Sequence, residues 1–394
     1  MILSGCRSRE EESDEKEYHI YSDGTYVEGI STDVSREEED IETELYIPEG
    51  MKTDQLSRTV LTESELELYD RIASDIGSFS EKAPLTVESN IYQRVAELVR
   101  IEQLAYTQVS GVGLELNSDT LIFDVLYTYR FTLTEANRMN RAAEEAAKQI
   151  MEGISPGMDD YEKLKYFHDY LVLNCVPSTD DPYADTIYGA LVRGKALCEG
   201  YTKAFSYLCN LAGIENVIVT GVTDVPHMWN MVKLGGNWYH VDVTWDDSSD
   251  KLHEDYPDII LYQYFMVTDS VIRNNHTISS YPAEPPKANG KNENYFVREG
   301  ADISSEEEFF TASDNAITAA AAERKRGAMV KFETSDLFIS VTSRLERESV
   351  EGSVDAVFEP IISRIRSLYG INVRLSWTDY YGQYRILTYI IDYP

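Results

Sequence analysis

Three side chains in the middle of the chain have the types and surroundings that thiol chemistry needs: Cys198, His227 and Asp242. Apolar residues at helical spacing follow the cysteine, so the sequence predicts a helix over about 198–212. Cys198 then lies at the helix N-terminus, where free N–H groups and the helix dipole favour the thiolate form. The charge of Glu199 opposes this effect, so the sequence also calls for a cationic or basic group nearby.

A predicted β-hairpin brings the histidine and the aspartate together. Two apolar and aromatic runs flank Gly235 and Gly236, a residue pair suited to a tight hairpin turn. With this turn, His227 lies opposite Thr244 and on the same face as Asp242, its diagonal neighbour. Diagonal residues are about 7–8 Å apart, which is close enough for a carboxylate to bond an imidazole N–H.

A cysteine at a helix start, a histidine on the facing sheet and an aspartate that orients the histidine form a nucleophilic triad. We expect Cys198 to attack a carbonyl carbon, His227 to take and return the proton, and Asp242 to fix the imidazole tautomer. The amide N–H of Cys198 is one expected oxyanion donor. The sequence does not identify the second donor.

Six motifs lie between residues 161 and 281: His168-Asp-Tyr-Leu171, Tyr188-Gly-Ala-Leu191, Gly194-Lys-Ala-Leu-Cys198-Glu-Gly-Tyr201, His227-Met-Trp-Asn230, Trp238-Tyr-His-Val-Asp242-Val-Thr-Trp245 and Tyr264-Phe-Met-Val-Thr-Asp269. This region resembles the bacterial transglutaminase-like superfamily, whose core is similar to papain-type cysteine peptidases. The resemblance implies an α+β fold in which a cysteine-bearing helix packs on an antiparallel sheet. It also implies that Cys198, His227 and Asp242 are the catalytic triad, without a cofactor or a metal.

The expected function is therefore that of a thiol enzyme acting on peptide or amide bonds through an acyl-enzyme intermediate. A peptidase or amidase would resolve the acyl-enzyme with water, and a transglutaminase-type enzyme with an amine. Both readings imply a protein or peptide substrate. The alternative is a catalytically inactive transglutaminase-like module that binds peptides or cell-wall components at the cell surface.

Two further alternatives concern the same residues. His240 shares a strand face with Asp242 and competes with His227 for it, although the motif pattern favours His227. Cys198, His227 and Asp242 are also residue types that zinc accepts as ligands. The geometry that a thiol nucleophile needs explains the three residues without a metal.

The remaining candidate residues are expected to be structural. His168 fits a core histidine on the apolar face of a helix. Cys175 and Cys209 fit core thiols, and a disulfide between them is the alternative outside the cell. Asp246 and Asp247 lack the glycine and the terminal glutamate of a calcium-binding loop, so they are expected in a solvated loop.

The composition narrows the class of partner. The chain has 394 residues with a net charge of −34, and such an acidic surface argues against nucleic acids and anionic lipid headgroups as ligands. Leu3-Ser-Gly-Cys6 resembles the lipobox of bacterial lipoproteins, which predicts an extracytoplasmic protein with a lipid anchor at Cys6. From Arg7 to Leu45 there are 15 acidic and 4 basic residues, typical of an extended spacer, with a small hairpin expected over Tyr18–Val27.

These patterns divide the chain into four parts. Residues 1–50 form an acidic tether, residues 55–155 an N-terminal α+β domain, residues 156–285 the transglutaminase-like core, and residues 291–394 a C-terminal α+β module. Within the last part, the sequence predicts a strand over 329–341.

Overall fold

The cysteine-bearing helix begins at the predicted residue. In the computed structural model, α7 spans Cys198–Leu211. Its side chains at Tyr201, Ala204, Phe205 and Leu208 are fully buried, because their spacing places them on one helical face. The helix packs on strands β8 and β9. The structure describes residues 18–20, 26–28, 43–53, 55–106, 108–247, 255–256, 258–350 and 354–394.

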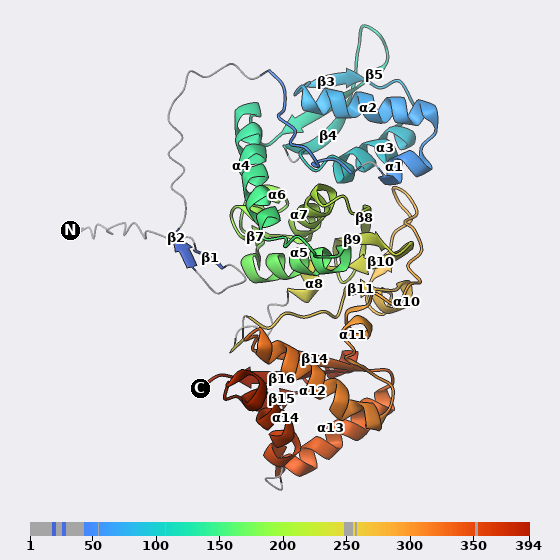
Figure 1. Ribbon diagram of the computed structural model, residues 1–394. Helices are drawn as coiled ribbons and strands as arrows, with labels where there is room; N and C mark the ends of the chain where they lie inside the picture. The colour runs from blue at the N-terminus through green and yellow to red at the C-terminus, as the bar shows by residue number, and fades with distance from the viewer. Residues whose placement is uncertain are drawn as a thin grey trace, which may run out of the picture. The chain divides into compact units, whose positions relative to one another are not determined.

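The sheet beside α7 is antiparallel, as expected. Its five strands lie in the order β11-β10-β9-β8-β12. They are β8 (Asn216–Val222), β9 (Pro226–Leu234), β10 (Asn237–Val241), β11 (Phe265–Val267) and β12 (Thr277–Ile278). Helices α5 (Asp160–Asn174), α6 (Ile187–Leu191) and α8 (Val243–Asp246) also contact α7. The predicted fold class is therefore confirmed: an α+β core in which the cysteine helix packs on an antiparallel sheet (Figure 1).

The β9–β10 hairpin has the predicted register near its turn. Leu234 pairs with Asn237, and the two turn glycines have φ angles of +57° and +81°, which side chains with a Cβ rarely adopt. The predicted pairing of His227 with Thr244 is wrong. Strand β10 ends at Val241, and the chain turns there into the short helix α8.

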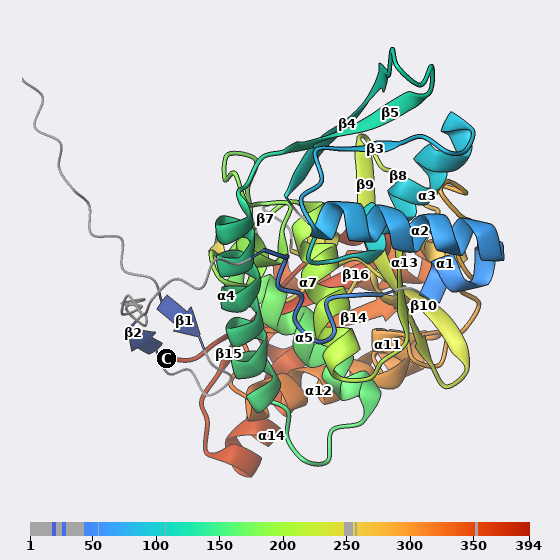
Figure 2. The same ribbon diagram turned by 90° about the horizontal axis from the view of Figure 1, so that it is seen from above.

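The part of the chain before this core is built from helices and a small sheet. Its elements are α1 (Gln55–Val60), α2 (Glu63–Gly77), β3 (Lys82–Pro84), α3 (Ser89–Glu102), β4 (Val109–Leu116), β5 (Phe123–Tyr129) and α4 (Leu133–Glu152). The strands lie in the order β3-β5-β4, so β4 is an edge strand. Figure 2 shows β4 and β5 as a hairpin that projects from the elements beside it. The sequence pattern did not predict β4, because its glycines interrupt the apolar run.

Short elements complete the core. They are β6 (Val176–Pro177), β7 (Lys195–Ala196), α10 (Asp269–Ile272) and α11 (Tyr295–Arg298). Strands β6 and β7 pair in parallel just before the cysteine helix. One hydrophobic cluster runs from Leu45 to Ala288 and so includes side chains of α2, α3, α7 and the five-stranded sheet.

The C-terminal part has a second hydrophobic cluster and a four-stranded sheet in the order β13-β14-β16-β15. Its elements are β13 (Asp302–Ile303), α12 (Glu306–Ala322), β14 (Gly327–Phe332), α13 (Ser335–Val350), α14 (Val354–Tyr369), β15 (Arg374–Thr378), a 3-10 helix (Gly382–Tyr384) and β16 (Ile386–Asp392). The predicted strand over 329–341 is wrong beyond Phe332. The Thr334 hydroxyl accepts a hydrogen bond from the N–H of Leu337, and a helix begins there that buries Phe338 and Val341.

Residues 1–41 and 42–394 form two compact units. In the first unit, β1 (Tyr18–Ile20) and β2 (Tyr26–Glu28) pair as an antiparallel hairpin, as predicted. Cys6 and most of the acidic tether lie outside the described residues. In the part of the chain that the structure describes, no helix combines the length and the apolar character that crossing a bilayer requires.

Candidate functional site

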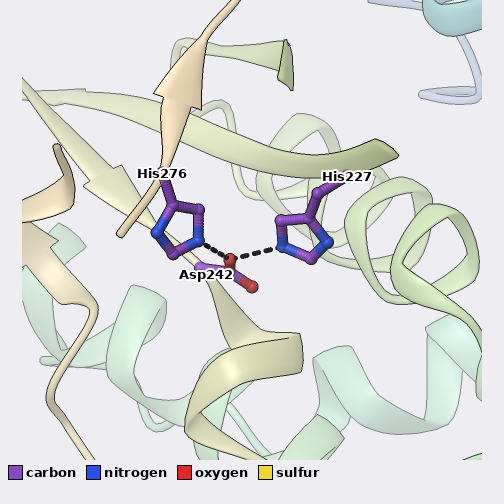
Figure 3. Close-up of side chains that lie close together, drawn as sticks. All are labelled: His227, Asp242 and His276. Atoms are coloured by element: carbon purple, nitrogen blue, oxygen red, sulfur yellow. Dashed lines mark hydrogen bonds and ion pairs between the residues drawn. The ribbon is translucent and has the colours of Figure 1, made fainter. Parts of the chain in front are cut away.

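Asp242 and His227 form a short hydrogen bond. The Nε2 atom of His227 lies 2.6 Å from Oδ2 of Asp242, and the carboxylate is 1% exposed (Figure 3). Asp242 is also the N-cap of α8, where its Oδ1 accepts the N–H of Trp245 at 3.1 Å. The turn that ends β10 therefore holds one carboxylate oxygen, and His227 binds the other. The aspartate meets the histidine although the strands no longer pair there.

Cys198 interacts with the same imidazole. As the first residue of α7 it is partly exposed, and its thiol raises the pKa of the His227 side chain. Because Nε2 of His227 binds Asp242, Nδ1 is the nitrogen left for the sulfur. The structure thus brings together the three residues that the sequence singled out, in the order thiol, imidazole, carboxylate.

The charges of this group favour a protonated imidazole. Burial lowers the pKa of His227, but the charge of Asp242 and hydrogen bonds to Asp242 and Cys198 outweigh burial and raise it to about 10. Burial raises the pKa of Asp242, whereas the charge and hydrogen bonds of His227 and His276 lower it to about 2. A thiolate nucleophile requires a protonated imidazole beside it, and a carboxylate on that imidazole stabilises its positive charge.

Two cationic side chains lie beside Glu199, where the sequence called for one. Nη1 of Arg100, from α3, lies 2.6 Å from Oε1 of Glu199, and Nζ of Lys203 lies 2.8 Å from the same oxygen. Burial raises the pKa of Glu199, but Lys203 and Arg100 lower it to about 2. Two positive charges and one negative charge therefore surround the first turn of the cysteine helix. No pattern in the sequence indicated Arg100, which lies 99 residues from its partner.

A second histidine, which the sequence patterns did not indicate, binds the carboxylate of Asp242. Nε2 of His276 lies 3.0 Å from Oδ2 of Asp242, the oxygen that His227 also binds (Figure 3). Its Nδ1 lies 2.8 Å from Oδ1 of Asn275, and its ring packs against Trp245 with the centroids 4.8 Å apart. His276 immediately precedes β12, only seven residues after the last motif noted in the sequence. That proximity was the available signal.

Among the described residues, His227, Asp242 and His276 hold three atoms of metal-ligand type within 4.8 Å of one another. Two imidazoles and a carboxylate are a ligand set that zinc accepts. Both imidazoles direct Nε2 to the same carboxylate oxygen, at hydrogen-bond distances. The hydrogen bonds account for the positions of all three side chains, and Cys198 is not in this group.

The competing histidine has other partners. The imidazole of His240 accepts the indole N–H of Trp229 at 2.9 Å, and its Nε2 lies 3.0 Å from Oδ1 of Asp269. It is fully buried, and burial lowers its pKa. His240 therefore supports the sheet beneath His227 through Trp229, whose ring stacks on that of His227.

The histidine that was expected to be structural is buried, and so are two aspartates that were expected in solvent. His168 is fully buried, and its Nε2 lies 3.1 Å from Oδ2 of Asp246. The predicted solvated loop at Asp246 and Asp247 is wrong for these two residues, because α8 turns both side chains inward. Asp247 accepts the hydroxyl of Tyr201, and burial raises the pKa of its carboxyl to about 7.

Cys175 and Cys209 are buried free thiols. Burial raises the pKa of both, so neither has the environment of a reactive cysteine. Of the three cysteines that the structure describes, Cys198 alone is partly exposed, and its thiol raises the pKa of His227.

Parts of this chain are similar to known proteins. Two curated relatives are the kyphoscoliosis peptidases of Mus musculus and Homo sapiens, each 34% identical over 64 residues. The match covers 13% of this chain and spans a tenth of the length of these relatives. A solved structure described as a crystal structure of a TGase covers 43% of this chain and 52% of its own, with 15% identity and a TM-score of 0.26.

The family comparison covers the region of the site. Residues 146–243 match the family model of the transglutaminase-like superfamily. This range includes the cysteine helix, the β9–β10 hairpin and the aspartate that follows it. The central part of this chain is thus similar to the transglutaminase-like superfamily over the residues that include Cys198, His227 and Asp242.

Proposed function

We propose that the protein is a thiol enzyme that acts on peptide or amide bonds through Cys198, His227 and Asp242. The observation that carries the proposal is the hydrogen bond of 2.6 Å between His227 and Asp242, on an imidazole whose pKa is also raised by the partly exposed Cys198 thiol. A buried structural cysteine would need neither the histidine nor partial exposure. The match of residues 146–243 to the family model of the transglutaminase-like superfamily supports the same activity.

The proposed chemistry proceeds in two halves. The Cys198 thiolate attacks the carbonyl carbon of an amide, and the oxyanion that forms accepts the N–H of Cys198, which has no partner within the helix at this position. The His227 imidazolium then gives its proton to the leaving nitrogen, the C–N bond breaks, and a thioester remains on Cys198. Asp242 holds the imidazole in place and stabilises its positive charge throughout.

In the second half, His227 removes a proton from the incoming nucleophile. Water gives a carboxylic acid and an amine gives a new amide, and in both cases the thiol leaves from the tetrahedral intermediate. The residues of the triad serve both outcomes equally. The nucleophile that reaches the thioester therefore determines whether the enzyme hydrolyses or transfers.

The decisive experiment uses the wild type and Cys198→Ala with a peptide library, in the presence and absence of a primary amine, with products read by mass spectrometry. We expect cleaved peptides without amine, or amine-adducted peptides with it, and neither with Cys198→Ala. Activity that is unchanged in Cys198→Ala would overturn the proposal. Activity that is lost on chelation with EDTA and restored by zinc would do the same, because the proposed chemistry needs no metal.

A chemical probe separates this proposal from a catalytically inactive binding module. Iodoacetamide should alkylate Cys198 rapidly at neutral pH in the wild type and slowly in His227→Ala. Cys175 and Cys209 provide internal controls, because both are buried. Equal, slow labelling of Cys198 in both proteins would favour the binding module.

A further inference from the structure

A cavity of about 480 Å³ lies between helices α2 and α3 and strand β4. Its walls are mainly apolar and aromatic, and include Ile76, Ala96, Val99 and Tyr127. This size and composition are typical of ligand sites in proteins. The residues of the proposed triad do not line it, so it is a separate feature of the fold.

The cavity runs along the backbone of an edge strand. Six consecutive residues of β4, from Val109 to Leu114, line it. Because successive side chains of a strand point to opposite faces, contact with six in a row means that the cavity meets the backbone of β4 as well as its side chains. The backbone N–H and C=O groups of β4 lie at this edge, and no other described strand than β5 pairs with β4.

The faces of β4 are also partly uncovered. A Cβ at Gly111 would meet no atom within 4 Å, and one at Gly113 would only touch Leu126 at 3.9 Å. Val112 and Leu114 are about half exposed, at 50% and 48%. Edge strands are often protected by lysine, proline, a bulge or a covering element. The sequence of β4, Val-Ser-Gly-Val-Gly-Leu-Glu-Leu, has neither lysine nor proline, and its irregular register lies at its start, between Val109 and Gly111.

The cavity lies beside the first turn of the cysteine helix. Arg100 belongs to its wall, and the same guanidinium binds Glu199, the residue that follows Cys198. Tyr281, another wall residue, comes five residues after His276 and is half exposed. Arg100 thus joins the cavity wall to the residue next to Cys198.

We propose that this cavity is a substrate-binding site for an extended peptide segment, which pairs with β4 as an added strand and places a large apolar side chain between α3 and β4. The proposal rests on the proposed function, since it names the substrate class of the same enzyme. The backbone edge of β4 that no described strand pairs with can form strand hydrogen bonds with a peptide, which a lipid chain or a small apolar molecule cannot form. The apolar walls give the preference for a side chain such as Leu or Phe.

Binding is tested in Cys198→Ala, so that no turnover is needed. The probe is a capped, fluorescein-labelled peptide of alternating Thr and Leu with terminal lysines, and its control is the same peptide N-methylated at alternate backbone amides. Ala96→Trp fills the cavity from α3, and Ala319→Trp, at an exposed position of α12, is the matched control. Leu114→Lys adds a charge at the free edge, where the side chain is exposed and the fold should tolerate it.

We expect the dissociation constant to rise at least about tenfold in Ala96→Trp and in Leu114→Lys, and to stay unchanged in Ala319→Trp. The N-methylated peptide should bind at least about tenfold more weakly than its parent, because it cannot pair with a strand. Equal binding of the two peptides, or unchanged binding in Ala96→Trp, would overturn the proposal. Concentration-dependent dimerisation that Leu114→Lys abolishes would also overturn it, since a second copy would then occupy the edge.

The two proposals fail separately. Peptide binding with these properties in Cys198→Ala, together with a wild type that neither cleaves nor modifies peptides, would leave the binding site standing and overturn the thiol enzyme. Rapid alkylation and amide chemistry in the wild type, together with peptide kinetics that Ala96→Trp leaves unchanged, would keep the enzyme and overturn the cavity as its substrate site.

Discussion

The Nε2 atom of His276 lies 3.0 Å from the Oδ2 atom of Asp242, the same oxygen that receives His227 at 2.6 Å. One oxygen of the Asp242 carboxylate thus accepts hydrogen bonds from two imidazoles, while the other oxygen accepts the N–H of Trp245. Because Asp242 is buried and held at both oxygens, its orientation toward His227 does not depend on the hydrogen bond to His227 alone. This arrangement gives His276 the part of a positioning residue in the proposed triad.

The role of His276 can be separated from simple structural support. His276→Gln keeps an N–H donor near the position of Nε2, whereas His276→Phe fills the space and removes the donor. We expect alkylation of Cys198 by iodoacetamide within about threefold of wild type in His276→Gln and slower by about 10- to 100-fold in His276→Phe, because small misplacements of a catalytic group are costly.

Melting temperature and a matched histidine provide the control for this pair. His168→Gln removes another fully buried histidine that does not bind Asp242, and it should lower the melting temperature without a comparable loss of Cys198 reactivity. If His276→Gln and His276→Phe slow alkylation equally, His276 only supports the fold.

Asp242→Asn tests the carboxylate itself. The amide keeps the size of the side chain but loses the charge that raises the pKa of His227, so that pKa should fall from about 10 toward its ordinary value. We expect kcat/KM on any peptide substrate to fall by roughly 10³- to 10⁴-fold, as is typical when the third member of a triad loses its charge. A loss below about tenfold in a folded protein would show that Asp242 does not orient the histidine.

The charges beside Cys198 should tune its reactivity in opposite directions. Glu199→Gln removes the negative charge next to Cys198 and leaves Lys203 without this partner, while Arg100 keeps its ion pair with Glu97. The net positive change stabilises a nearby thiolate, so alkylation at neutral pH should be faster by about three- to tenfold. Arg100→Gln should slow it by a similar factor. Both effects should shrink at high ionic strength, because Arg100 is 41% exposed. Equal signs for the two variants would contradict the electrostatic explanation.

The buried imidazole predicts how stability depends on pH. The pKa of His227 is about 10 in the folded protein and has its ordinary value of 6.5 in the unfolded chain. The folded state therefore binds the proton more tightly, so this stabilisation is complete below about pH 6.5 and is lost as the pH rises through about 10. The unfolding free energy should fall by on the order of 2–5 kcal/mol over this window.

Chemical denaturation at a series of pH values measures this effect, and His227→Gln is its control. The variant should be less stable than the wild type near neutral pH, and the difference between the two should narrow toward pH 10. A constant difference across the window would mean that His227 does not change its protonation there.

Local patterns were sufficient for the part of the site that lies close in sequence. The helix that begins at Cys198 and the turn at Gly235 follow from spacing and from glycine conformation, and together they place His227 near the sulfur. The exact pairing near Asp242 was not predictable in this way, because α8 replaces the strand where its N-cap bond forms.

Contacts that are distant in sequence were beyond the patterns. His276 reaches Asp242 from 34 residues away, and Arg100 reaches Glu199 from 99 residues away, through packing that no local periodicity encodes. The cavity was hidden for a different reason. Its strand β4 is rich in glycine and largely exposed, so it lacks the alternation that marks a half-buried strand.

The single hydrophobic cluster that joins Leu45 to Ala288 has a practical consequence for work on this protein. A fragment limited to residues 146–243 would lose the packing partners that α3 and the flanking strands supply, and it would expose the apolar surfaces that they cover. We expect such a fragment to aggregate when it is expressed alone. Residues outside the family match are therefore as necessary to the proposed catalyst as Cys198, His227 and Asp242 are.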